Sequence, residues 1–158
     1  MKKLFAVGAI LIVGWFLVFL FLPALQEDLP SLRDHVKEMK GEYPALEKVQ
    51  YRYAQGDFQV DLYVENLDEA AVIKEELKSF LASEPFLSEF LPWAEEKVGW
   101  GESTFGKMPP YPDISISCTQ SGEEERSWAS FAMYYAEPYR SDQDLEVDGY
   151  QTWDDAYY

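Results

Sequence analysis

The chain has 158 residues, of which 47% are hydrophobic and 27% charged, and its formal net charge is −16. All 29 acidic residues but only 11 of the 13 basic ones follow residue 26, so that part of the chain carries a formal charge of −18. A field of this sign repels phosphate, which excludes nucleic acid as a partner and favours basic partners. Residues 27–158 are the size of one domain with a single core.

Residues 1–26 predict a membrane anchor. Lys2 and Lys3 precede an unbroken apolar run of 19 residues from Leu4 to Leu22. A helix of that length spans about 29 Å, enough to cross a hydrocarbon core of roughly 30 Å. The two lysines favour a cytoplasmic N-terminus and place the remaining chain on the outer side of the cell membrane. A cleaved secretory signal is the alternative, but its apolar stretch is usually only about 7–15 residues long.

The first half of the remaining chain predicts a helix, a hairpin and a second helix. Apolar residues at helical spacing predict a short amphipathic helix over residues 31–40. Alternation over residues 49–53 and 58–64, around a tight Gln55-Gly56 turn, predicts a β-hairpin with one buried face. A capping-box-like start and an apolar stripe predict a longer helix over residues 66–81.

The second half predicts a short helix, a loop and another hairpin. Residues 83–91 predict a helix that Pro92 can break. Residues 99–113 are rich in Gly and Pro, so they can form neither a regular helix nor a central strand. Residues 114–118 and 127–136 alternate as strands, with an acidic loop between them.

These elements predict an α+β fold in two layers. An N-terminal transmembrane helix (1–26) precedes an extracytoplasmic domain (27–136) and an acidic, aromatic tail (137–158). The domain is expected to contain an antiparallel sheet of about four strands with helices on one face, in the order α-β-β-α-β-β.

Few residues are suited to catalysis. Nucleophilic catalysis needs a nucleophile beside a base, and the chain has one histidine, His35, and one cysteine, Cys118. Cys118 alternates with apolar residues and is expected to be a small buried hydrophobe. His35 is expected at an exposed or membrane-surface position. The sequence therefore does not predict an enzyme, and a hydrolase whose residues meet only in the folded chain stays an alternative.

The tail contains an incomplete calcium-loop pattern. The candidate metal ligands are Asp144, Glu146, Asp148, Tyr150 through its carbonyl, and Asp155, with Gly149 at the sharp turn. Over these 12 residues the pattern resembles an EF-hand loop, but Asp155 is shorter than the usual bidentate Glu. The favoured interpretation is an acidic, partly disordered tail without a metal.

Aromatic residues suggest a binding surface. The candidates for partner binding are Trp100, Tyr150, Trp153, Tyr157 and Tyr158, which can anchor a protein or stack on sugars. The leading hypothesis is a single-pass, membrane-anchored module at the cell envelope that recognises a protein, and the negative charge favours a basic one. The alternative is a ligand-binding module, either for calcium through the tail or for cell-wall glycan through the loop around Trp100.

Overall fold

The computed structural model describes residues 28–54, 57–98, 101–103, 106–108, 111–136 and 146–157. The predicted anchor, residues 1–26, lies outside these ranges. Within them, no helix is both long and apolar enough to cross a membrane. The anchor therefore stays a prediction from the sequence.

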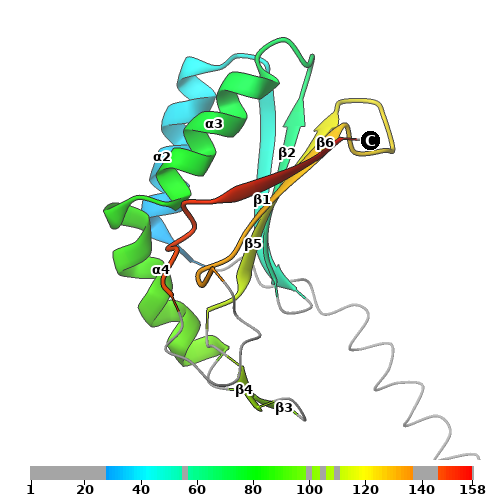
Figure 1. Ribbon diagram of the computed structural model, residues 1–158. Helices are drawn as coiled ribbons and strands as arrows, with labels where there is room; N and C mark the ends of the chain where they lie inside the picture. Colours follow the sequence, from blue (N-terminus) through cyan, green and yellow to red (C-terminus); the bar gives the residue numbers. More distant parts are fainter. Residues whose placement is uncertain are drawn as a thin grey trace, which may run out of the picture.

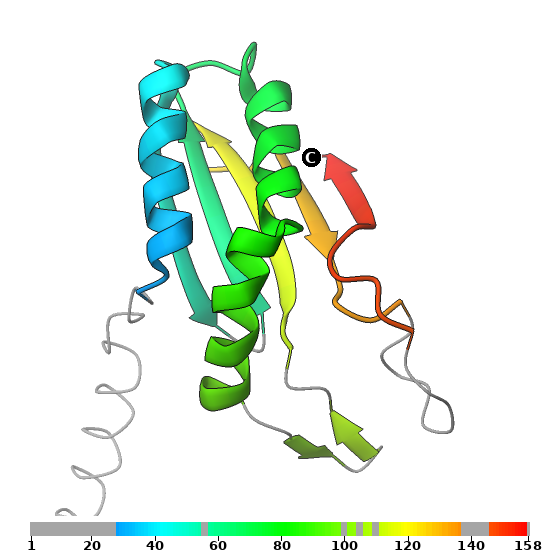
Figure 2. The same cartoon turned by 90° about the vertical axis from the view of Figure 1, so that its left-hand side faces the viewer.

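The described residues form a mixed α+β fold in two layers. Five strands make one sheet in the order β1-β2-β5-β6-β7. These strands are β1 (Leu46–Ala54), β2 (Asp57–Val64), β5 (Asp113–Gln120), β6 (Trp128–Ala132) and β7 (Trp153–Tyr157). Three helices, α2 (Pro30–Glu42), α3 (Ala70–Leu81) and α4 (Glu84–Lys97), cover one face of the sheet (Figures 1 and 2).

The predicted antiparallel sheet of about four strands is wrong in two respects. The central strands β2 and β5 run parallel, and the other neighbouring pairs are antiparallel. The reason is that α3 and α4 together return the chain to the end where β2 begins, so that β5 starts in the same direction. The fifth strand, β7, comes from the part of the chain predicted as a tail and pairs with β6.

The hydrophobic core lies between the sheet and the three helices. Because side chains alternate along a strand, every second residue of the central strands points at the helices. The fully buried residues of β2 and β5 are Phe58, Val60, Leu62, Val64, Ile114, Ile116 and Cys118. From the helices, Phe86 and Phe90 contact Phe58, with ring centroids 6.3 and 5.0 Å away. This aromatic contact joins α4 to the start of β2.

The predicted break at Pro92 does not occur, because α4 continues to Lys97. A proline inside a helix leaves one carbonyl without its amide donor, here that of Ser88. Both Ser88 and Pro92 are exposed, so water can satisfy this carbonyl. The Gly- and Pro-rich stretch contains β3 (Gly101–Ser103) and β4 (Gly106–Met108), which form a small separate hairpin and not a central strand.

The second face of the sheet carries no helix in the described part of the chain (Figure 1). We call it the open face. On β2 it presents Asp57, Gln59, Asp61 and Tyr63, all partly exposed. On β6, Phe131 points to the same side and is 42% exposed. The open face is therefore a polar, partly aromatic surface without a cover among the described residues.

Candidate functional site

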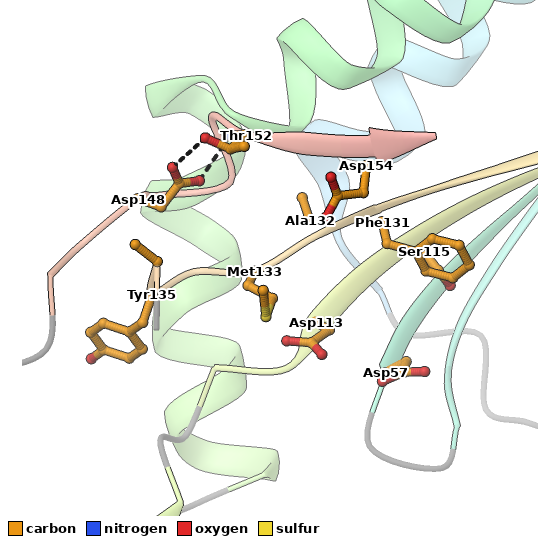
Figure 3. Close-up of a pocket in the computed structure, with 11 residues that line it drawn as sticks. Asp57, Asp113, Ser115, Phe131, Ala132, Met133, Tyr135, Asp148, Thr152 and Asp154 are labelled. Atoms are coloured by element: carbon orange, nitrogen blue, oxygen red, sulfur yellow. Dashed lines mark hydrogen bonds between the residues drawn. The ribbon is translucent and has the colours of Figure 1, made fainter. Parts of the chain in front are cut away.

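The open face contains a pocket of about 430 Å³ at the end of the sheet where β2 and β5 begin (Figure 3). We call it the acidic pocket. Its lining residues are Asp57, Asp113, Ser115, Phe131, Ala132, Met133, Tyr135, Ala136, Asp148, Thr152 and Asp154. They come from β2, β5, β6 and β7 and from the segments next to β6 and β7. The volume lies in the range of roughly 300–1,000 Å³ that is usual for ligand sites.

Two of its aspartates are neighbours across the parallel pair of strands. Asp57 and Asp113 are the first residues of β2 and β5, and they are register partners. The following residues, Phe58 and Ile114, point into the core, so alternation directs both aspartates to the open face. Adjacent strands lie about 4.8 Å apart, which brings the two carboxylates close together (Figure 3).

The surroundings of these two carboxylates disfavour their charge. Burial raises the pKa of Asp57 above its ordinary value. Burial also raises the pKa of Asp113, and the negative charge of Asp57 adds to the effect. In the described part of the chain, neither carboxylate pairs with a basic side chain, and no Lys, Arg or His lines the pocket. Four residues further along β2, by contrast, a carboxylate oxygen of Asp61 lies 3.6 Å from the Arg52 guanidinium.

Two further aspartates come from the end of the chain. Asp148 accepts hydrogen bonds from the Thr152 backbone amide at 2.9 Å and from its hydroxyl at 2.8 Å (Figure 3). These bonds fix the turn that precedes β7. Asp154 on β7 is the register partner of Phe131 on β6, so both point to the open face. The pocket therefore combines four carboxylates with the apolar side chains of Phe131 and Met133.

The predicted partner-binding residues are not gathered at one place. Tyr150 is fully buried, and its hydroxyl donates to the Pro112 carbonyl at 2.8 Å, so this side chain is not available to a partner. Trp153 is partly buried and lies on the helix-covered side of β7. Tyr157 is the last residue of β7. Trp100 and Tyr158 lie outside the described residues.

The predicted calcium ligands are likewise separated. Asp144 lies outside the described residues, and Glu146 is exposed. Asp148 belongs to the open face, whereas Asp155 accepts hydrogen bonds from Lys74 and Lys78 on the other face, each at 2.8 Å. Within the described ranges, no group of three or more His, Cys, Asp or Glu side chains is arranged to hold a metal ion.

Cys118 is buried, and His35 is partly buried. Cys118 is fully buried, as the alternation predicts, and burial raises the pKa of its thiol to about 11. The thiol is therefore protonated at neutral pH and is not a nucleophile. His35 is not at an exposed position, because its ring stacks on Phe80 with the centroids 3.9 Å apart. Burial lowers the pKa of His35, although Glu76 and Glu38 oppose this effect.

Comparison of the chain with protein-family models, with curated proteins and with solved structures finds no match.

Proposed function

We propose that this protein is a membrane-anchored binding module that captures a basic partner protein through the acidic pocket on its open face. The observation that carries the proposal is a pocket lined by four aspartates and, among the described residues, by no basic side chain. A lysine or arginine side chain of a partner would supply the missing positive charge.

The raised pKa values of Asp57 and Asp113 support a cationic ligand. A cation placed between two carboxylates favours their charged form and lowers both pKa values. Each pKa unit corresponds to about 1.4 kcal/mol of interaction between the carboxylate and its surroundings. Binding of a basic group therefore relieves the repulsion between the two carboxylates, and this relief contributes favourably to the free energy of binding.

The apolar wall of the pocket supports a side chain and not a bare ion. Lysine and arginine carry a positive head on an apolar stem, and the stem packs well against aromatic or aliphatic surface. Phe131, 42% exposed, and Met133 provide such a surface beside the carboxylates. An exposed aromatic residue next to charged groups is typical of a protein-binding surface.

If the predicted anchor crosses the membrane, the acidic pocket faces that membrane. In the fold, the chain enters α2 toward the end of the sheet where β2 and β5 begin (Figure 2). If residues 1–26 cross the membrane, the acidic pocket lies on the membrane-facing half of the domain. The partner would then be a protein with a basic segment close to the outer membrane–water boundary.

The test measures binding of an acetylated, amidated tetra-arginine peptide to the full chain in lipid nanodiscs. The double variant Asp57→Asn/Asp113→Asn is expected to weaken binding by about tenfold or more, equivalent to about 1.4 kcal/mol. The matched control is Glu124→Gln/Glu125→Gln, which removes the same charge from the exposed loop between β5 and β6. Equal losses of affinity in both double variants would mean that the peptide is attracted only by the overall negative charge, and the acidic pocket would then not be the binding site.

A further inference from the structure

A second cleft lies on the helix-covered side of β7. Its volume is about 370 Å³, and its lining residues are Glu75, Lys78, Ser79, Ala82, Gln151 and Trp153. We call it the α3–β7 cleft, because it lies between the last turns of α3 and the start of β7. Strand β7 separates it from the acidic pocket, since Trp153 and Asp154 point to opposite faces of the sheet.

The charges in this cleft balance each other. The Lys78 side chain is only 9% exposed, and its ammonium donates to Asp155 at 2.8 Å and to Glu75 at 3.3 Å. Lys74 donates to the other oxygen of Asp155, also at 2.8 Å. Two lysines thus face two carboxylates, so the cleft has no excess charge to attract an ion. A ligand that fits it is neutral and polar.

Hydrogen-bonding groups in the cleft are held in fixed positions. The Gln151 amide nitrogen donates to the Ala82 carbonyl at 3.1 Å and to the Gly149 carbonyl at 3.4 Å. Both amide hydrogens are therefore used within the protein, which orients the amide oxygen as an acceptor. Ser79 adds a hydroxyl that can both donate and accept, and Glu75 adds a carboxylate at the rim.

Trp153 provides an apolar surface in the same cleft. Its ring lies 5.7 Å from the Lys78 ammonium and packs against the edge of the core, which limits its motion. A fixed indole beside fixed hydrogen-bonding groups is complementary to a ring that has one apolar face and hydroxyls around its edge. A pyranose sugar has this shape and polarity.

We propose that the α3–β7 cleft binds a neutral saccharide, with Trp153 stacking on the sugar ring and Gln151, Ser79, Glu75 and Lys78 bonding its hydroxyls. This site is separate from the acidic pocket and does not depend on the function proposed above. It gives the module a second ligand, of glycan chemistry, on the opposite side of the same strand.

The test uses the full chain in lipid nanodiscs without glycolipid or sugar-headed detergent. Cellotriose, maltotriose and the N-acetylglucosamine trimer are each added to about 10 mM, a range suited to weak binding. The indole N–H signal of Trp153, assigned with Trp153→Phe, reports binding by nuclear magnetic resonance. We expect a saturable shift with at least one trisaccharide, and a loss of affinity of about fivefold or more in Gln151→Ala.

Matched controls separate the cleft from other surfaces. Gln50→Ala and Ser88→Ala change exposed residues of β1 and α4 and should leave the shift unchanged. Ser79→Ala should weaken binding, which provides a second variant if Gln151→Ala proves unstable in thermal unfolding. The proposal is overturned if no trisaccharide shifts the Trp153 signal, if both cleft variants bind normally, or if acetate gives the same shift and thereby identifies an anion site on Lys78.

Discussion

At the scale of single residues, Asp113 contributes a carboxylate to the acidic pocket but lowers the stability of the fold. Its carboxylate is pushed toward the neutral form by burial and by Asp57. The folded state therefore holds the Asp113 proton more tightly than the unfolded state does. Stability then falls as the pH rises from the unfolded pKa of about 3.9 through the higher folded pKa, and the full penalty is present above the folded pKa.

We therefore expect Asp113→Asn to increase the free energy of unfolding at pH 7. The gain is up to about 1 kcal/mol after allowance for solvent screening, and it shrinks as the pH approaches the unfolded pKa. Urea denaturation of wild type and variant across this pH range measures it. The control Asp68→Asn changes an exposed aspartate and should stay within about 0.5 kcal/mol of wild type. Destabilisation by Asp113→Asn at pH 7 would contradict the account of the pocket.

At the level of elements, β7 is held to the domain by an ionic cluster. Asp155 lies between Lys74 and Lys78, one helical turn apart on α3, and also accepts a hydrogen bond from Ser130 at 2.5 Å. Burial by itself raises the pKa of Asp155, but the hydrogen bonds from the two lysines and Ser130 outweigh it and lower the pKa. This contribution to stability is present above the unfolded pKa of about 3.9 and is lost as the pH falls below it.

Asp155→Asn is expected to lower the free energy of unfolding by about 2–3 kcal/mol, because it leaves two buried ammonium groups without their carboxylate. The value lies below the usual 3–5 kcal/mol for breaking a buried pair, since the Asp155 side chain is 29% exposed. The neighbouring Asp154→Asn, on the open face, serves as the control and should cost less than about 0.5 kcal/mol. Chemical denaturation measures both variants, and equal costs would show that the cluster does not hold β7.

Local patterns predicted most of the elements but not their arrangement. Periodicity and turn residues identified the first hairpin, α2 and α3, because each depends on residues close in sequence. The parallel pairing of β2 with β5 depends on how α3 and α4 cross the sheet, so the meeting of Asp57 with Asp113 was not predictable. The only available signal was that each aspartate begins an alternating strand.

Strand β7 was missed for a related reason. Its sequence, Trp153 to Tyr157, contains two acids and lacks the alternation of a half-buried strand. Asp155 can face the helices only because Lys74 and Lys78 approach it from α3. In the sequence, those lysines lie beside the apolar stripe of α3. A charged side chain is unusual at such a position, so it was the one indication that an acidic partner would be buried there.

At the scale of the whole molecule, the net negative charge and the acidic pocket both favour a basic partner. The part of the chain after residue 26 carries a formal charge of −18, which attracts basic proteins from a distance. The acidic pocket then supplies a defined place where that attraction becomes a contact. Strand β7 contributes to both proposed sites, with Asp154 in the acidic pocket and Trp153 in the α3–β7 cleft. Removing residues 137–158 would therefore remove structure as well as binding groups, which makes point variants the better test.

The most direct test of the central claim is to measure the pKa values of Asp57 and Asp113 by nuclear magnetic resonance with and without the tetra-arginine peptide. In the free protein both should lie above the ordinary value for aspartate. With the peptide bound, both should fall by about one unit or more, because a cation then lies between them. Unchanged pKa values in the presence of saturating peptide would show that the basic group does not enter the acidic pocket.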